Sequence, residues 1–599
     1  MTARHRHEMP FGTRILDDGR GVLFRLYAPA AQRVGLRYGS DSEPQSLMLD
    51  SARRGWFEGV APGAAAGTRY RFAIDGLLAP DPASRFQPEG VHGPSAVVDP
   101  GAFDWPDDGW TGRPWNEHVF YELHVGTFTP EGTYAAAQTK LDDLADLGIT
   151  AVELMPLGEF PGARNWGYDG VLPYAPSHNY GAPEDLKRFV AAAHERRLAV
   201  YLDVVYNHFG PEGNYLWTYA PNFYTERYRT PWGAAIDVAA PANDDVRAFF
   251  VENALYWLGE YRFDGLRFDA VHAIHDGPKR RFLREMAATI RARVDRQVHL
   301  VLENEDNEAA ILDAYTAQWN DDAHHGAHVA ITGQTEGYYA DYARAPVRLL
   351  GRALTHGFAY QGEPSQARGG RSRGSPSAQL PLCAFVDFLQ NHDQIGNRAF
   401  GERITALAPL DAVRAASAVL LLAPSIPLLF MGQEWGASSP FLFFCDFEPE
   451  LARDVTAGRR NEFRTFAAFS DRAERERIPD PAALETFAAS ILNWPERELA
   501  PHRELLAFHR DLLRLRRERI AARIAAVRGT DADFVTIGTR GLHAWWLLDG
   551  ATLHLEANLA AEPAGGFASQ PLGAPIFSTH GDTFTGAQAP AWSVRWTLR

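Results

Sequence analysis

The sequence predicts an α/β fold: a (β/α)8 barrel with a β-sandwich module before it and a β domain after it. Three observations lead to this prediction. Short alternating runs fill roughly the first hundred residues, apolar strand-like runs then alternate with helical patterns, and β-prone runs return near the end. We expect the module at residues 1–110, the barrel at 111–520 and the closing β domain at 521–599.

The N-terminal module is predicted from runs such as residues 22–27 and 70–74, in which apolar and polar side chains alternate between Gly, Pro and Asp turns. Successive side chains of a strand point to opposite faces, so each run offers one face to a core and one to solvent. Two small sheets packed face to face satisfy this pattern.

Eight apolar segments in the middle of the chain are predicted as barrel strands. Helical patterns lie between them, for example where Pro183 begins a helix whose buried face holds Leu186, Phe189 and Val190. Buried strands that alternate with helices are typical of a parallel barrel. The expected strands are residues 119–128, 151–155, 199–205, 266–270, 300–303, 317–319, 383–389 and 428–431.

Two connections differ from ordinary barrel loops. Residues 209–243 are too long and too rich in aromatic side chains for a simple connection, so we expect them to cross the active face. Residues 368–374 consist of Gly, Arg and Ser, which is typical of an exposed connection.

The composition excludes several classes of protein. With 46% hydrophobic residues the chain is neither disordered nor fibrous, and 75 acidic against 59 basic residues give a net charge of −16, which disfavours nucleic acid as a partner. Two cysteines, Cys383 and Cys445, make no disulfide framework. The first residues lack an apolar run, and Pro424 and Pro427 interrupt the apolar stretch 418–431. We therefore expect no signal peptide, no membrane contact and a cytoplasmic location.

Four predicted strands end in ionisable residues. The segments are DVVYNH (203–208), GLRFD (265–269), LENE (302–305) and LQNHD (389–393). Side chains two apart on a strand share a face, so Arg267 points with Asp269 and Asn391 with Asp393. In a parallel barrel the carboxyl ends of all strands meet at one mouth, which predicts a single polar site.

Several carboxylates beside an arginine in one cleft fit glycoside hydrolysis with retention of configuration. One carboxylate attacks the anomeric carbon, and a second, about 5 Å away, protonates the leaving oxygen. Asp269 beside Arg267 suits the nucleophile, while Glu303 suits the acid if burial or negative neighbours keep it protonated. Asp393 then binds sugar hydroxyls and favours a distorted ring.

Aromatic side chains around the predicted mouth are candidates for stacking on sugar faces. They are Trp166, Tyr168, Trp217, Tyr228 and Trp232.

The motifs DVVYNH, GLRFDAVHA, LENED and FLQNHD, in this order, resemble the four short motifs of the alpha-amylase superfamily, glycoside hydrolase family 13, whose fold is a TIM barrel. This resemblance implies the same nucleophile, general acid/base and transition-state stabiliser: Asp269, Glu303 and Asp393. It also implies sugar-binding roles for Tyr168, His208, Arg267 and His392.

Further segments resemble the trehalose-releasing hydrolases of that superfamily: residues 81–95, 206–216, 228–237, 388–398, 431–436 and 450–463. The resemblance implies a substrate, maltooligosyltrehalose or a related α-1,4-glucan oligosaccharide, whose α-1,4 bond next to the terminal trehalose is hydrolysed. It also implies that the N-terminal module is related to carbohydrate-binding modules of branching and debranching enzymes. Residues 367–375 and Asp237 depart from the expected pattern, and the oligomeric state is left open.

Two alternatives remain at this point: a glucan branching or debranching enzyme of the same superfamily, and an inactive carbohydrate-binding protein on this fold. A cofactor is not expected. Asn207 suits the calcium site of ordinary alpha-amylases, but Ala273 stands where those enzymes have a histidine, with His272 one position early. We therefore predict no required metal.

Overall fold

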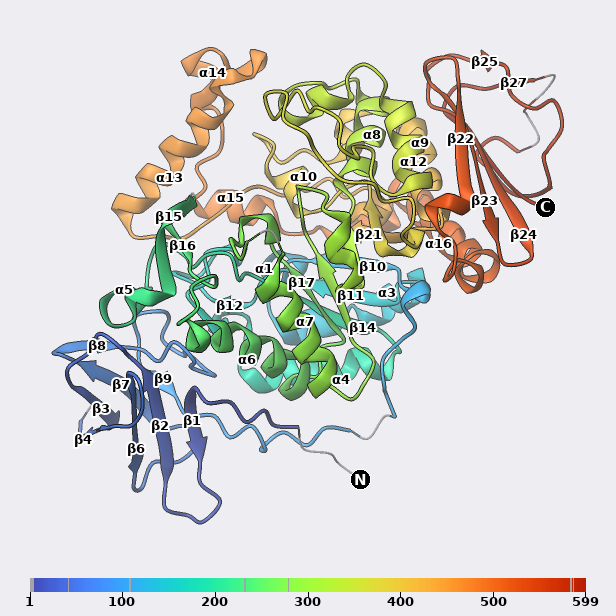
Figure 1. Ribbon diagram of the computed structural model, residues 1–599. Coiled ribbons are helices and arrows are strands. Elements are labelled where there is room, and N and C mark those ends of the chain that lie inside the picture. Colours follow the sequence, from blue (N-terminus) through green and yellow to red (C-terminus); the bar gives the residue numbers. More distant parts are fainter. Residues whose placement is uncertain are drawn as a thin grey trace.

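The computed structural model describes residues 5–40, 42–106, 109–230, 233–277, 279–581, 584 and 587–599. Along the chain come two small β-sheets, a barrel with its helices, and a final β-sheet (Figure 1). The first sheets and the last sheet lie at opposite sides of the barrel (Figure 1).

Two antiparallel sheets form the N-terminal module. The alternation seen in the sequence buries one face of each, and the rings of Phe24 and Tyr70 meet edge to face across the core at 4.9 Å. One sheet has the order β1 (Gly12–Ile15), β2 (Val22–Tyr27), β6 (Trp56–Ala61), β5 (Asp50–Ser51). The other has the order β4 (Pro44–Met48), β3 (Val34–Gly39), β7 (Arg69–Ile74), β8 (Leu77–Ala79), and β9 (Ser95–Ala96) pairs with β7.

The central sheet is a closed barrel of eight parallel strands in sequence order, and the last strand pairs with the first. Its strands are β10 (Phe120–Leu123), β11 (Ala151–Leu154), β14 (Ala199–Val204), β17 (Gly265–Phe268), β18 (His299–Leu302), β19 (Ala317–Trp319), β20 (Phe385–Phe388) and β21 (Ile426–Phe430). Each lies within or overlaps one of the eight predicted segments, which confirms the predicted fold class.

The first predicted strand was too long. β10 ends at Leu123, and α1 (Val125–Phe128) follows as a buried helical turn. An apolar run does not by itself distinguish a strand from a buried helix. Gly126 permits this turn, since a Cβ there would lie 2.9 Å from the His124 ring and 3.0 Å from the Tyr180 ring.

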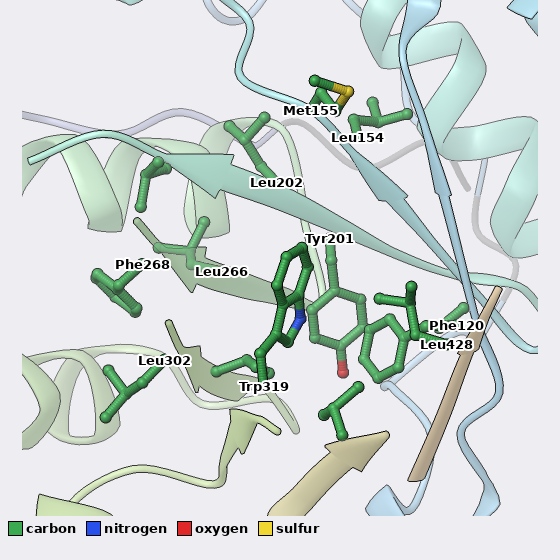
Figure 2. Packing of buried hydrophobic residues seen from close by; sticks show 14 of the residues in the cluster. Phe120, Leu154, Met155, Tyr201, Leu202, Leu266, Phe268, Leu302, Trp319 and Leu428 are labelled. Atoms are coloured by element: carbon green, nitrogen blue, oxygen red, sulfur yellow. The ribbon is translucent and has the colours of Figure 1, made fainter. Parts of the chain in front are cut away.

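Aromatic and aliphatic side chains fill the barrel below its mouth, and Figure 2 shows Phe120, Tyr201, Trp319 and Leu428 among them. The Tyr201 and Phe120 rings meet at 4.7 Å. Tyr201 occupies the space over Gly265, where a Cβ would come within 2.1 Å of the ring. This packing closes the barrel floor, so Arg267, two residues further along β17, points inward nearer the mouth.

Helices surround the barrel. They include α2 (Tyr134–Gln138), α3 (Leu141–Leu147), α4 (Pro183–Glu195), α6 (Asp244–Glu260), α7 (Arg281–Arg293), α8 (Asp321–Thr332), α9 (Pro346–His356), α10 (His392–Gly396), α11 (Ile404–Leu407) and α12 (Leu410–Leu422). Some, such as α4, bury one face, whereas α8 is buried on nearly all sides. After the last strand come α13 (Pro449–Glu462), α14 (Arg472–Glu476), α15 (Leu484–Ala489) and α16 (His502–Arg519).

The excursion predicted at 209–243 contains α5 (Leu216–Tyr219) and the hairpin β15 (Tyr224–Thr230) with β16 (Gly233–Ile236); a smaller hairpin, β12 (Gly158–Glu159) with β13 (Leu172–Pro176), precedes it. Trp217 stacks on Tyr224 at 3.9 Å, and Tyr228 stacks on His275 at 4.0 Å. Trp232 lies outside the described residues.

The last sheet has the order β22 (Ala532–Ile537), β23 (Gly541–Leu548), β24 (Ala551–Asn558), β28 (Ser593–Leu598), β26 (Ala574–Ser578); β25 (Ala564–Gly565) pairs with β27 (Gln588–Ala589). The indole N–H of Trp596 donates to the Ala418 carbonyl on α12 at 3.0 Å, and that of Trp546 donates to the Leu354 carbonyl on α9 at 3.2 Å. These bonds fix the sheet against the outside of the barrel. Among the described residues, none of the helices has the length and apolar character needed to cross a bilayer.

Candidate active site

The four polar strand ends converge on Arg267, a side chain of β17 with no exposed surface. Its Nη1 donates to Asp203 Oδ2 at 2.7 Å and to Asp269 Oδ1 at 2.8 Å, and its Nη2 lies 3.2 Å from Glu303 Oε2. Burial opposes the charge of this guanidinium, but the surrounding carboxyl groups, Asp203 first, raise its pKa. One cation therefore holds carboxyl groups from three successive strand ends.

The Arg267 guanidinium also lies over the ring of Trp319, from strand β19, at 4.3 Å. The ring supports the side chain from below, so its nitrogens stay aimed at the mouth.

Asp269 is fixed through both carboxyl oxygens. Oδ1 accepts from Arg267, and Oδ2 accepts from the Asn207 amide at 2.6 Å. The next residue, Ala270, has φ of 41°, in the left-handed region that costs a non-glycine residue about 1–2 kcal/mol. This turn points the Ala270 N–H at Glu303 Oε2, 2.6 Å away.

Burial raises the pKa of Glu303; Arg267 opposes this effect, and the charge of Asp269 adds to it. Burial likewise raises the pKa of Asp203 to about 7, although Arg267 again acts in the other direction. The raised pKa of Glu303 favours its protonated form, which is the form that a general acid requires.

Glu122, a buried residue of β10, positions the segment that carries Asp393. It accepts from the His392 Nδ1–H at 2.5 Å and from the His392 backbone N–H at 3.1 Å. Burial lowers the pKa of His392, but Asp393 and Glu122 outweigh it and raise the value to about 9. The imidazole is therefore a cation at neutral pH, 3.6 Å from Asp393 Oδ2.

Tyr168 and His208 complete the group of predicted residues. The Tyr168 ring stacks on His392 at 5.0 Å, and its hydroxyl donates to Asp203 at 2.6 Å. His208 Nε2 lies 2.9 Å from the Tyr168 carbonyl oxygen, and the other ring nitrogen contacts Asn207. The structure thus brings Asp269, Glu303, Asp393, Tyr168, His208, Arg267 and His392 into one network.

Glu122 was missed by the sequence analysis. The signal was present, because it is a carboxylate within the apolar run FYELHV, at an inward position that pairs in register with Glu153. Trp166 proved to be a packing residue: its ring stacks on Phe441 at 5.2 Å and its N–H donates to the Leu442 carbonyl.

A cavity of about 500 Å³ opens beside Glu303 and Asp393. It is lined by Glu303, Glu305, Trp319, Asp321, His325, Gly337, Tyr338, Asp341, Ser365, Ala367, Arg368, Arg373, Asn391, Asp393, Gln394 and Asn397. The stretch 368–374, expected to be an exposed connection, supplies part of this wall. Arg368 is tied to Glu305 at 3.0 Å and to Asp306 at 2.6 Å, and buried Arg373 is tied to Asp322 at 2.9 Å.

Asn207, the candidate calcium ligand, uses its amide within the protein: the N–H donates to Asp269, and the oxygen contacts His208. Within the described ranges there is no cluster of three or more His, Cys, Asp and Glu side chains suited to a metal ion. That no metal is required stays a prediction.

A parallel barrel whose mouth joins two carboxyl groups through one guanidinium, beside a third carboxylate, has the arrangement of a glycoside hydrolase. Family models agree. The alpha amylase catalytic domain matches residues 103–229, carbohydrate-binding module 48, the isoamylase N-terminal domain, matches 10–82, and a domain of unknown function, DUF3459, matches 529–596.

Curated relatives match most of the chain. A malto-oligosyltrehalose trehalohydrolase of Deinococcus radiodurans is 44% identical over 519 residues, which is 86% of this chain and 84% of that protein. One of Saccharolobus solfataricus is 37% identical over 85% of this chain and 87% of its own length. The chain belongs to the malto-oligosyltrehalose trehalohydrolase family.

Solved structures agree with this fold. A crystal structure named as an alpha amylase of Salmonella typhimurium is 43% identical, has a TM-score of 0.92, and is matched over 99% of this chain and all of that one. A group B Streptococcus pullulanase in complex with maltotetraose, at 16% identity and a TM-score of 0.72, covers 100% of this chain and 88% of its own; it supports the fold alone.

Proposed function

We propose that this protein hydrolyses the α-1,4-glucosidic bond next to the terminal trehalose of maltooligosyltrehalose, with retention of configuration, and releases trehalose and a maltooligosaccharide. The observation that carries the reaction type is the Arg267 guanidinium, which contacts Asp269 and Glu303 through neighbouring nitrogens. The relationship to the malto-oligosyltrehalose trehalohydrolases supports the proposed substrate.

The reaction begins when an Asp269 carboxylate oxygen attacks the anomeric carbon and Glu303 gives its proton to the glycosidic oxygen. The maltooligosaccharide is then bound covalently to Asp269, and trehalose leaves. Glu303, now a carboxylate, takes a proton from water as the water attacks the same carbon, and Asp269 is released. Two inversions at one carbon give net retention.

The remaining residues act on the sugar ring at the cleaved bond. Asp393 and the His392 cation bind its hydroxyl groups, and the Tyr168 ring, fixed against His392, offers a stacking surface. Arg267 and Asn207 hold the plane of the nucleophile. A separation of about 5 Å between the Asp269 and Glu303 carboxyl groups stays a prediction.

The cavity beside Glu303 supports a disaccharide as the leaving group, because a volume of about 500 Å³ accommodates a ligand of that size. The N-terminal module matches a carbohydrate-binding module, which supports α-1,4-glucan oligosaccharides as the substrate class. We further propose a cytoplasmic location, consistent with two cysteines that are both free and buried.

Product analysis tests the proposal. Purified protein is incubated separately with maltohexaosyltrehalose and with maltohexaose, and the products are identified by chromatography. Rapid trehalose release from the first substrate and slow reaction of the second are expected. Equal cleavage of both substrates would contradict the proposed specificity.

A branching activity is the second candidate, because a 1,4-alpha-glucan branching enzyme of Burkholderia thailandensis is 34% identical over 279 residues, 43% of this chain. New α-1,6 branches in the product mixture would support that activity, and their absence would exclude it.

A further inference from the structure

Asp321 is a carboxyl group of the active-site cavity that the reaction described above does not use. It follows β19 and is the first residue of α8, so the barrel places it at the mouth beside the strand ends that carry Glu303 and Asp393. Its side chain is only partly buried and opens to the cavity.

Two other carboxyl groups of the cavity wall are already engaged. Glu305 pairs with Arg368 at 3.0 Å. Asp341 accepts from the Ser365 hydroxyl at 2.6 Å and from the Ala367 N–H at 3.0 Å, one bond to each oxygen. Both side chains are thus engaged with the loop 363–374.

Asp321 differs from them. Its Oδ1 accepts from the Gln394 amide at 3.2 Å, and in the part of the chain that the structure describes it has no ion pair and Oδ2 has no hydrogen-bond donor. Arg373, a cation of the same wall, is committed to Asp322. Asp321 thus lines the cavity with one oxygen, Oδ2, that accepts no hydrogen bond from the described residues.

Burial raises the pKa of Asp321 to about 8, and the charges of Glu303 and Asp393 add to this effect, while Arg373 opposes it. At neutral pH the group is a carboxylic acid, with a hydroxyl that donates and a carbonyl that accepts. A sugar hydroxyl likewise both donates and accepts, so the two groups are complementary.

The position of the cavity indicates which sugar would meet Asp321. The cavity wall contains the acid Glu303 and one side chain proposed to bind the attacked sugar, Asp393, but neither the nucleophile Asp269 nor the stacking residue Tyr168. The acid protonates the oxygen of the leaving group, whereas the nucleophile lies on the side of the sugar it attacks. The cavity thus receives the leaving sugar.

We propose that Asp321 is a specificity-determining residue that hydrogen-bonds a hydroxyl group of the leaving sugar. The assignment rests on the proposed function for the identity of that sugar as trehalose, but the contact itself requires only a sugar leaving group.

Two substrates separate the roles. Maltohexaosyltrehalose has a sugar leaving group, and α-maltosyl fluoride has fluoride, which needs no contact in the cavity. Asp321→Ala is expected to lower kcat/KM for the first about tenfold to a hundredfold, the loss of one or two hydrogen bonds, and to leave the second within about twofold. Asp321→Asn keeps a donor and an acceptor, so it should restore most of the activity on the first substrate at pH 7.

Asp411→Ala is the matched control, because Asp411 also lies in the first turn of a helix, α12, but outside the cavity. It reports the cost of removing a negative charge from a helix N-terminus. Its kinetics should match the unaltered protein on both substrates.

Equal losses on both substrates in Asp321→Ala would overturn the proposal, because Asp321 would then act on the catalytic centre. Unchanged activity on the trehalose substrate would overturn it as well, and so would an Asp321→Asn variant as impaired as Asp321→Ala. If the unaltered protein released no trehalose, the proposed function would fail instead, and maltohexaose would replace the first substrate in the same comparison.

Discussion

Arg267→Lys is the most informative single change at the site, because the geometry says which contact lysine loses. The Nη1 atom of Arg267 contacts Asp203 and Asp269, whereas its Nη2 atom lies 3.2 Å from Glu303 Oε2. A lysine has one nitrogen and can replace Nη1, so Glu303 alone loses its cation. Nη2 makes no hydrogen bond to Glu303, so the contact is purely electrostatic. An interaction on the order of 1 kcal/mol predicts a fall in kcat/KM of about fivefold.

The pH profile provides a second signature of the same change. Arg267 opposes the rise in the Glu303 pKa, so its removal should raise that pKa further. A general acid is active while protonated, and activity is lost as the pH rises through its pKa. The alkaline limb of kcat/KM against pH should therefore move to higher pH in Arg267→Lys while the maximal rate falls.

The assay measures trehalose release from maltohexaosyltrehalose between about pH 4 and 10. The matched control is Arg284→Lys, because Arg284 is a partly buried arginine that is likewise paired with a carboxylate, Asp313, but does not line the cavity. An alkaline limb that stays in place or moves to lower pH would refute the assignment of Glu303 as the acid held by Arg267.

Three further predictions follow from the same network. Asp269→Ala should lower kcat by about four orders of magnitude or more while calorimetry still detects substrate binding; unchanged turnover would refute the assigned nucleophile. Glu122→Gln should lower the His392 pKa from about 9, because one of the charges that raise it is removed. In the unaltered protein the raised His392 pKa contributes stability that is fully present below pH 6.5 and lost as pH rises through about 9. Because Asp393 also raises this pKa, the urea midpoint of Glu122→Gln should fall over that window by a smaller amount than that of the unaltered protein. Exhaustive chelation should leave activity undiminished, and a loss restored only by calcium would contradict the prediction that no metal is required.

The barrel was predictable because its strands are buried on both faces. Such runs stand out from the amphipathic helices between them, and even the short strand 317–319 was located correctly. The error at 124–128 has the same origin, since burial alone does not encode whether an apolar backbone extends or coils.

The catalytic group was predictable because each member follows a strand, and parallel strands end at one mouth. Glu122 and Asp321 were harder. Glu122 acts through His392, 270 positions away in sequence, and only the closed barrel brings them together. Asp321 becomes a candidate for sugar binding only when the structure shows that two other carboxyl groups of the cavity, Glu305 and Asp341, are bonded to the loop 363–374.

Composition predicted the loop 368–374 only in part. Residues 369–372 are exposed, as a run of Gly, Arg and Ser predicts, but Arg373 is 5% exposed and packs on Tyr360 while it pairs with Asp322. Arg368 and Arg373 pair with acidic residues of distant segments, 305–306 and 322. The local sequence around the arginines does not indicate these partners.

The division of labour among the carboxyl groups follows from a charge balance. Glu122, Asp203, Asp269, Glu303 and Asp393 surround only two cations, Arg267 and His392. If all five were ionised, the buried site would carry an uncompensated charge of −3, which a low-dielectric interior does not tolerate. Some of these carboxyl groups must therefore keep a proton. Burial raises the pKa of Asp203 to about 7 and also raises that of Glu303, in each case by more than Arg267 lowers it. A shortage of cations thus favours a protonated Glu303, while both oxygens of its neighbour Asp269 are held by donors, and this difference supports the proposed roles of acid and nucleophile.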